Sequence, residues 1–501
     1  LHDPSAEHRA FAKERGCATN TALEDPPEPL AKEAFDLVLL EETAHVGIEE
    51  AATLSRDLVA WTTDNALGYK RSSGSRGEFR TTTPFAFLFA LLFRSKGRLG
   101  PRRAALARAL GRPPSSWRGA ALYPDRLDFA FAIDLDRGTP KLTIGPKERT
   151  NRLKWFGYRL GLFPLLAPSF ALWARRQETS QTRLLDVLLR QLETELEVTL
   201  NSHDPEYLVA TRGNTALIQT TGGWVLRVPL GHRPLAAARQ NAAALEIVRE
   251  RFPAVPVAAP LFQGDLRPTP EHPGVFVTVE TRFPGLGAGQ LSGNLVAMGR
   301  LTRELGQLLA SLATRPAAPL DELDLEQLLV APFRTVRERC GDVGTSQALD
   351  TLEAEVLGLA RGLVIPRVAC HRDLRPKHVI AVVEGERAGS LVGIVDWSAF
   401  DELGPPLYDL FHFIAQERAQ RPGWSSARAW KALESRAGLE PAEREAIEAY
   451  ETALSLPAGW YTVVAKAYPV LFGAMAEQHW DYSRPRWLKR LFRFGVETPS
   501  G

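Results

Sequence analysis

The chain has 501 residues and a formal net charge of +2 at pH 7, with 45% hydrophobic and 24% charged residues. This length allows two or three domains, and the composition is that of proteins with ordinary globular cores. A charge so close to zero argues against a dedicated nucleic-acid-binding protein. No apolar run reaches the length of a membrane span, and no secretory signal is visible.

The cysteines Cys17, Cys340 and Cys370 show neither metal-ligand nor Cys-x-x-Cys spacing. An odd number of unclustered cysteines favours a reducing compartment, so we expect a cytoplasmic protein. Three segments with basic or aromatic flanks, described below, add the expectation of a peripheral membrane contact.

The N-terminal part of the chain is expected to form an α/β domain. Residues 35–40 and 57–62 have the apolar character of buried strands, and residues 48–56 between them have a helical pattern. Alternating strands and helices predict a parallel sheet. Residues 118–123 and 129–134 are predicted to close it as an antiparallel pair.

This region resembles the later part of a class I S-adenosylmethionine-dependent methyltransferase, which implies a partial Rossmann-like domain. Residues 35–40 resemble that family's fourth strand, and Asp3 stands where an acid would bind the cofactor ribose. The glycine-rich turn that approaches such a cofactor has no counterpart after Leu1. We therefore expect residues 1–178 to be a truncated methyltransferase-like domain of a longer fusion, without methyl transfer. The alternative is a docking domain that never had the turn.

Three segments combine apolar residues with basic or aromatic flanks: 85–93, 152–176 and 484–494. Such flanks suit a bilayer surface. The alternative for the first two is a pair of core helices or a lid, and the alternative for the third is a helix that caps the helical lobe with a basic outer face. Pro164 and Pro168 favour that alternative for the second segment, because they prevent one continuous helix.

Residues 179–205 are predicted to form a linker helix, because leucines recur there with helical spacing. Residues 206–285 are predicted to form a small β-rich lobe, whose first strands are 207–210, 215–219 and 224–229.

Residues 286–501 are predicted to form a helical lobe. Helices are expected over 295–312, 325–339, 347–363, 410–416, 427–436, 441–454 and 460–478. Pro332 is expected to kink or restart the second of these helices.

Two carboxylates inside this lobe are placed as phosphoryl transfer requires. Asp373 precedes an apolar strand, 379–383, and Asp396 ends the next strand, 391–395, with a glycine-containing hairpin turn between the strands. The two acids should therefore lie close together. One could orient or deprotonate a substrate hydroxyl while the other holds Mg²⁺ against the phosphates of ATP. The alternative is two surface acids that share a hairpin by chance.

The stretch from residue 371 onward resembles the catalytic loop of the aminoglycoside phosphotransferase and choline kinase-like superfamily, which has a protein-kinase-like α+β bilobal fold. His371, Asp373 and Asp396 match its His-x-Asp and apolar-apolar-Asp-Trp patterns, and Asp409 matches a later Pro-x-x-Asp-Leu. The resemblance implies that Asp373 is the catalytic base, Asp396 the principal metal ligand, His371 a brace and Asp409 a buttress of the loop. Arg375 is grouped with the catalytic residues.

His378 stands where this family usually has a metal-binding Asn, and the chain is similar to macrolide phosphotransferases in that respect. An imidazole is a poorer ligand for Mg²⁺ than an amide oxygen. His378 is therefore expected to bind one metal weakly, to bind a softer ion, or only to position Asp373.

The same resemblance assigns nucleotide-binding positions in the β-rich lobe. Arg227 stands where kinases place the lysine that binds the α- and β-phosphates; the alternative is an exposed cation at a strand edge. On the helix expected over 235–251, the acidic partner of that position aligns with Asn241, with Glu246 as a second candidate. The residues expected at the phosphate-covering loop and at the adenine hinge are Gly213, Asn214, Thr215, Glu280, Thr281 and Arg282.

The acceptor site has weaker signals. Glu445, Glu448 and Glu451 recur at threes and could face a cationic acceptor, but a solvated helix face explains them better. His412 could bond to a sugar, although a lone aromatic residue is more often part of a core.

The leading hypothesis is an ATP- and Mg²⁺-dependent O-phosphotransferase that acts on a small-molecule, sugar or glycan hydroxyl, in glycan or natural-product tailoring. The departures at Asn241 and His378 favour the alternative of a catalytically weak module that binds nucleotide or glycan. A third possibility is a membrane-surface scaffold.

Overall fold

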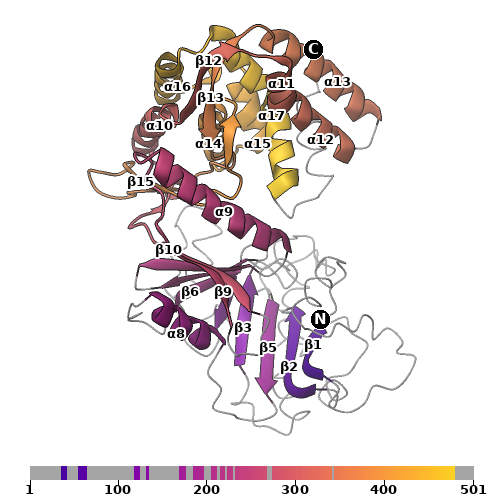
Figure 1. The fold of residues 1–501 in the computed structure, drawn as a ribbon, viewed down its shortest axis with the longest axis vertical. Coiled ribbons are helices and arrows are strands. Elements are labelled where there is room, and N and C mark those ends of the chain that lie inside the picture. The colour runs from indigo at the N-terminus through magenta and orange to yellow at the C-terminus, as the bar shows by residue number, and fades with distance from the viewer. Residues whose placement is uncertain are drawn as a thin grey trace, which may run out of the picture. The chain divides into compact units, whose positions relative to one another are not determined.

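The computed structural model describes residues 35–41, 55–64, 118–123, 131–134, 169–175, 184–196, 205–210, 215–220, 223–229, 232–267, 274–340 and 343–479. The chain divides into two compact units. The first comprises Leu1–Pro234 and Phe262–Val279, and the second comprises Leu235–Leu261 and Glu280–Gly501. Each unit is described by itself, with the element labels of Figure 1.

The N-terminal strands of the first unit form one mixed sheet. They are β1 (Phe35–Glu41), β2 (Ser55–Asp64), β3 (Arg118–Tyr123), β4 (Phe131–Asp134) and β5 (Ser169–Arg175), in the order β1-β2-β5-β3-β4. The expected parallel pairing holds for β1 and β2, and the expected antiparallel pair of β3 and β4 is present. β5 runs antiparallel to both of its neighbours, so the sheet is mixed rather than purely parallel.

β5 corrects part of the expectation for residues 152–176. Its residues occupy the middle of the sheet instead of a core helix, a lid or a membrane-surface helix. A short continuous apolar run suits a buried strand as well as a helix, so periodicity could not separate them. The predictions for Asp3, for residues 85–93 and for the basic tail at 484–494 lie outside the described residues.

A second sheet follows, with one helix packed on it. Its strands are β6 (Pro205–Ala210), β7 (Thr215–Thr220), β8 (Trp224–Pro229), β9 (Pro260–Leu266) and β10 (Val275–Thr281), in the order β6-β7-β8-β10-β9. The predicted linker helix is present as α8 (Leu184–Leu196). Leu188 and Leu192 of α8 are buried in one cluster with Trp224 and Leu226 of β8, so the leucine pattern marks the face that contacts the sheet.

The second unit is mostly helical, as predicted. Its helices are α9 (His232–Arg251), η2 (Ala288–Leu291), α10 (Leu295–Ala310), α11 (Glu322–Leu325), η3 (Glu326–Val330), α12 (Ala331–Cys340), α13 (Val343–Ala360), α14 (Tyr408–Ala419), α15 (Ser426–Leu433), η4 (Arg436–Gly438), α16 (Pro441–Leu454) and α17 (Ala458–His479). The helix expected over 325–339 is divided: a π-helical segment, η3, precedes α12. Pro332 is the second residue of α12, which agrees with a restart.

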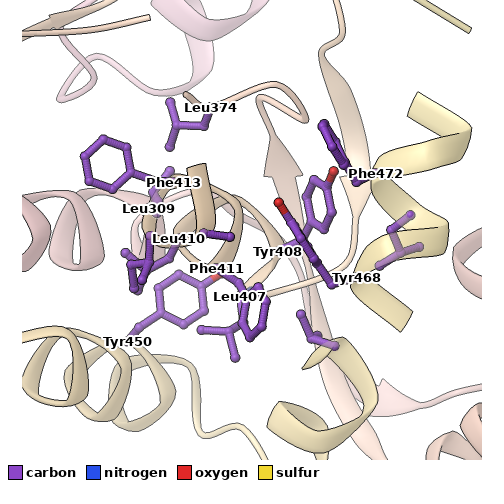
Figure 2. Close-up of a cluster of buried hydrophobic side chains, with 14 of the residues drawn as sticks. Leu309, Leu374, Leu407, Tyr408, Leu410, Phe411, Phe413, Tyr450, Tyr468 and Phe472 are labelled. Atoms are coloured by element: carbon purple, nitrogen blue, oxygen red, sulfur yellow. The ribbon is translucent and has the colours of Figure 1, made fainter. Parts of the chain in front are cut away.

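α14 runs through the core of this unit. All of its residues from Tyr408 through Ala415 are buried. Figure 2 shows how aromatic side chains of α14, including Tyr408 and Phe411, lie with Tyr468 and Phe472 of α17. A helix that is buried on every side must pair its polar side chains within the protein. The partners of Asp409 and His412 therefore matter for the site described below.

Two small sheets flank the predicted catalytic loop. β14 (Val379–Ala381) and β15 (Leu391–Ile394) form the predicted hairpin, and β11 (Leu286–Gly287) pairs with β14. The other sheet was not predicted: β12 (Ala313–Pro319), β13 (Val364–Cys370) and β16 (Asp401–Gly404), in the order β12-β13-β16. β13 ends at the residue before His371, so one sheet leads into the loop and the other leads out.

Every helix that the structure describes falls short of a membrane span in its length or in its apolar character.

Candidate active site

The loop from His371 to His378 is anchored by Asp409 of α14. The carboxylate of Asp409 accepts hydrogen bonds from the backbone N–H groups of His371, at 2.6 Å, and Arg372, at 2.9 Å. Arg372 has φ 68°, a conformation that side chains other than glycine rarely adopt, and its guanidinium lies 2.8 Å from Asp401. These contacts confirm that Asp409 buttresses the loop. Burial raises the pKa of Asp409 to about 7, against the hydrogen bonds that favour its ionised form.

Asp373 lies almost fully buried, with 6% of its surface exposed. One carboxylate oxygen, Oδ2, is 2.5 Å from Arg375 and 3.6 Å from Nδ1 of His378. The other, Oδ1, faces Nε2 of His412 at 3.5 Å. Burial by itself would raise the pKa of Asp373, but the hydrogen bond from His412 and the positive charge of Arg375 outweigh it and hold that pKa below its usual range. Asp373 is therefore ionised at neutral pH.

His371 connects the loop to the strand that precedes Asp396. Its Nε2 lies 3.0 Å from the backbone oxygen of Val395, and its ring centroid is 4.7 Å from that of Trp397. The side chain is fully buried. These contacts suit the bracing role that was expected of His371.

Asp396 follows β15 with φ 68°, so it also has left-handed backbone geometry. Its side chain is 32% exposed, far more than that of Asp373. Ser398 donates a hydrogen bond to Oδ1 of Asp396 at 3.1 Å. A strained backbone that presents a partly exposed carboxylate is typical of functional sites.

His378 contacts both acids with one imidazole ring. Its Nδ1 is 2.8 Å from the backbone oxygen of Asp373, and its Nε2 is 3.1 Å from Oδ2 of Asp396. Nδ1 must carry a hydrogen to donate to the backbone oxygen, so Nε2 of the neutral ring has a free lone pair. Burial, with the nearby charge of Lys377, lowers the pKa of His378 and favours that neutral ring.

A nitrogen lone pair and a carboxylate oxygen at this separation repel each other unless a proton or a metal cation lies between them. A metal-binding histidine commonly donates its other ring N–H to a backbone carbonyl, as His378 does. His378 and Asp396 therefore fit a divalent cation. Among the residues that the structure describes, no group of three or more His, Cys, Asp or Glu side chains is placed to hold a metal ion.

Asn241 of α9 reaches the residue after Asp396. Its Nδ2 donates to the carboxylate of Glu280 at 2.6 Å, and its Oδ1 accepts the backbone N–H of Trp397 at 2.7 Å. Both ends of the amide are thus engaged within the second unit. The second candidate for this position, Glu246, is exposed. Arg227 lies on β8 of the first unit, half-buried.

Of the three residues expected at the hinge, Thr281 uses both its side chain and its backbone N–H in hydrogen bonds with Ala259. Thr281 donates its backbone N–H to the oxygen of Ala259 at 2.9 Å, and its hydroxyl accepts the N–H of Ala259 at 2.8 Å. Because backbone groups alternate along an extended strand, those of Glu280 and Arg282 face the opposite edge. Thr215 begins β7, and Gly213 and Asn214 lie outside the described residues.

The residue that sequence reasoning missed is His412. It was considered as a sugar contact or a core residue, whereas its Nε2 faces Asp373. Asp409 and His412 are three residues apart and therefore share a helix face. Once Asp409 was expected to contact the loop, this spacing could have predicted that His412 does so too.

The acidic residues of α16 make ion pairs of their own. Glu445 lies 3.0 Å from Arg303 and Glu451 lies 2.5 Å from Arg436. The side chain of Glu445 is 61% exposed. These pairs agree with a solvated helix face better than with a site for a cationic acceptor.

Residues 210–446 match the model of the phosphotransferase enzyme family, APH. This segment of the chain belongs to that family. It includes the second-unit residues described above, from Asn241 to His412, and has the kinase-like fold of the phosphotransferases. No curated protein matches the chain.

Solved structures of several phosphotransferases are similar to this one. The GDP and kanamycin complex of APH(2")-IIia has 13% identity and a TM-score of 0.41, over 61% of this chain and 96% of that one. ADP-bound APH(2'')-Ib has 10% identity and a TM-score of 0.36, over 61% and 95%. A glucosamine kinase has 18% identity and a TM-score of 0.33, over 62% and 85%.

Proposed function

We propose that this phosphotransferase moves the γ-phosphoryl group of ATP to a hydroxyl group of a sugar, a glycan or a related natural product. The observation that carries the proposal is the contact of His378 with both acids: Nδ1 on the side of Asp373 and Nε2 on the side of Asp396. Through His378 the proposed base and the proposed metal ligand are neighbours, and phosphoryl transfer needs one group that orients the acceptor hydroxyl near another that holds the metal ion.

Asp373 is proposed to act on the acceptor. Its ionised carboxylate can accept the hydrogen of a substrate hydroxyl, which orients the oxygen toward the phosphorus. A carboxylate with a lowered pKa is a weak base, so it would take the proton late, when the new O–P bond has largely formed. Arg375 donates a hydrogen bond to Oδ2 of this carboxylate.

Asp396 and His378 are proposed to hold the divalent cation. Mg²⁺ is commonly bound through one or two protein groups, with phosphate oxygens and waters as its other ligands. When bound, the cation neutralises charge on the phosphates. Because His378 offers nitrogen, a cation that accepts imidazole more readily than Mg²⁺, such as Mn²⁺, should also support the reaction.

The remaining assignments stay predictions. Arg227 would bind the α- and β-phosphates, residues 213–215 would cover them, and the backbone of Glu280 and Arg282 would bind the adenine edge. The methyltransferase-like character of residues 1–178 and a membrane contact are predictions as well.

The acceptor is proposed to be neutral rather than strongly cationic. A polycationic acceptor needs several unpaired carboxylates. Glu445 and Glu451, the acids that the sequence offered for this purpose, already pair with arginines. A sugar or glycan hydroxyl makes no such demand.

The second candidate is a binding module with little turnover. It is favoured by Asn241, whose amide is engaged with Glu280 and Trp397 where the family has an acid. This module would hold a nucleotide but would not transfer its phosphate.

One experiment separates these candidates. The purified chain is incubated with ATP or GTP, Mg²⁺ or Mn²⁺, and a panel of neutral sugars, amino sugars, glycans and macrolides. We expect acceptor-dependent nucleotide consumption and a phosphorylated product by mass spectrometry. Asp373→Asn should lower the rate by about 10²- to 10⁴-fold and still bind nucleotide. Glu445→Gln, an exposed acid, is the matched control and should transfer phosphate normally.

The other outcomes decide against the proposal. Nucleotide binding without a phosphorylated product for any acceptor would support the binding module. A chain that binds neither nucleotide would exclude both candidates.

A further inference from the structure

Two buried polar atoms face each other beside the loop. Oδ1 of Asp373 and Nε2 of His412 lie 3.5 Å apart, and each lacks a hydrogen bond of ordinary length among the described residues. His412 is fully buried and Asp373 nearly so. An unpaired polar atom in a dry interior is unfavourable, so these two atoms are each other's partners. A catalytic hydrogen bond is often long before substrate binds.

The far side of the imidazole shows which nitrogen carries the hydrogen. Nδ1 of His412 is 3.0 Å from the hydroxyl oxygen of Tyr468, and Gln416 donates to the same oxygen at 3.3 Å. Because the amide of Gln416 fills an acceptor position on that oxygen, the hydroxyl can donate its own hydrogen to Nδ1. The hydrogen of a neutral His412 is then on Nε2, which points at Asp373.

The opposite tautomer is unfavourable. A hydrogen on Nδ1 would leave the lone pair of Nε2 facing a carboxylate oxygen in a buried site. Burial lowers the pKa of His412 to about 4, so the ring is neutral at pH 7 even beside Asp373. The charged and titratable groups around this pair are His371, Arg375, His378, Tyr408, Asp409 and Tyr468.

The imidazole has little freedom to turn. The ring of Tyr408 stacks on it at a centroid distance of 5.7 Å and an angle of 10°, and Phe472 packs at 4.9 Å. Figure 2 shows Tyr408, Tyr468 and Phe472 gathered between α14 and α17. Aromatic rings on two helices thus hold His412 in place.

We propose that His412 is a positioning residue: its Nε2–H binds Oδ1 of Asp373 opposite Arg375, and Tyr468 sets the tautomer that makes this possible. The inference rests on the proposed function, because Asp373 is the proposed base. With one donor on each oxygen, the carboxylate cannot rotate away from the acceptor hydroxyl. A chain of hydrogen bonds then runs from Gln416 through Tyr468 and His412 to Asp373.

The test compares three variants with the wild type. His412→Leu fills the space but removes the donor, and we expect kcat to fall about 10- to 100-fold, as it does when outer partners of a site residue are removed. The KM for ATP should stay unchanged. His412→Gln keeps an N–H near the position of Nε2 and should restore most of kcat. Phe413→Leu, on the same buried helix, is the control for lost packing and should keep its kcat.

A second readout does not depend on turnover. Nitrogen-15 NMR of the wild-type imidazoles should show His412 with its hydrogen on Nε2 and a bare Nδ1. Tyr468→Phe should raise the population of the other tautomer, and Asp373→Asn should shift the Nε2–H resonance.

Each outcome is decisive. A hydrogen on Nδ1, or equal kcat for His412→Leu and the wild type, would overturn the positioning role even in an active enzyme. If the leucine variant fails to fold, the glutamine variant and the NMR measurement still decide. A wild-type chain without transfer activity would overturn the proposed function and this inference with it.

Discussion

α14 carries two buried clusters of polar side chains, one near each end of the helix. The first joins Asp409 to the backbone N–H of Arg372 and His412 to the carboxylate of Asp373, both in the loop. The second joins Arg418, and Arg421 just after the helix, to Glu417 of α14 and to Glu440 and Glu443 at the start of α16. The clusters share a helix and a similar burial, but they differ in how fully their charges are matched.

In the second cluster, each charged side chain pairs with another charged side chain of the cluster. Arg418 makes two parallel hydrogen bonds with Glu443, one of them 2.9 Å long. Arg421 pairs with Glu417 at 2.6 Å and also with Glu440. Glu443 in turn accepts the backbone N–H of Glu440 at 2.8 Å, so every charge has a counter-charge or a donor. Such a network fixes α14 against α16 and leaves nothing for a ligand.

The first cluster has more carboxylates than cations among the contacts described above. Asp373 has one cation, Arg375, and its other neighbours, His378 and His412, are neutral imidazoles by burial. Asp396 adds a second carboxylate that is one-third exposed. These carboxylates are the proposed base and the proposed metal ligand. The difference teaches that one cluster of this helix holds two helices together, whereas the other gathers titratable groups whose pKa values are shifted, as is common at functional sites.

Of the variants that compare the two clusters, Asp396→Asn should have the largest effect on the rate of phosphoryl transfer. Asn tolerates a left-handed backbone, so the variant removes charge without new strain. We expect phosphoryl transfer to fall about 10²- to 10³-fold, and the free energy of unfolding to change by less than about 0.5 kcal/mol. Initial rates and urea unfolding measure the two quantities. Asp350→Asn, a change at an exposed acid, controls for the loss of one charge. If Asp396→Asn lowered the free energy of unfolding as much as Glu443→Gln does, the proposed difference between the two clusters would be wrong.

Glu443→Gln should lower the stability of the protein and leave the rate of phosphoryl transfer unchanged. It leaves the buried Arg418 without its full counter-charge, which costs about 3–5 kcal/mol of unfolding free energy. The rate per folded molecule should equal that of the wild type, because no contact of Glu443 reaches the loop in the described structure. The double variant Glu443→Leu/Arg418→Met should recover stability, since an apolar pair can replace a buried ion pair. A lower rate per folded molecule for Glu443→Gln would mean that the second cluster also affects phosphoryl transfer, and that the two clusters are not independent.

The smallest effect is a change of pH dependence in Asp409→Asn. The pKa of Asp409 is about 7 in the fold, against about 3.9 for an unfolded Asp. Between these values the native state holds a proton that the unfolded chain has lost, so this group's contribution to stability falls as pH rises.

Asn does not titrate, and its NH₂ group meets one backbone N–H of the loop. The variant should be less stable than the wild type at pH 5, and that difference should shrink toward pH 7. Urea midpoints at pH 5, 6, 7 and 8 measure it. Parallel curves for the two proteins would mean that Asp409 is ionised throughout.

The sequence predicted most elements because their patterns were strong and local. The helix over Pro441–Leu454 follows from its apolar spacing, and the hairpin of β14 and β15 follows from two apolar strands around a glycine-containing turn. It did not predict β12 and β13, because prolines interrupt both. Proline removes a ladder hydrogen bond, and the irregular register of this pair accommodates it.

In the candidate site, too, local patterns could be predicted from the sequence, whereas contacts between distant segments could not. Motif spacing placed Asp373 and Asp396 on one hairpin, the family resemblance added His378, and in the structure both acids contact the imidazole of His378. The partners of Asn241 could not be predicted, because they come from segments 39 and 156 residues away.

By itself, the sequence determined that this chain contains a phosphotransferase-like loop, because short spacings along two strands are local geometry. Only the tertiary structure decided that His412 faces Asp373 and that Tyr468, 56 residues further on, contacts the other side of its ring. The physical reason is that a buried polar side chain takes its role from whichever partner the packing of helices provides, and that packing is not written in any single segment.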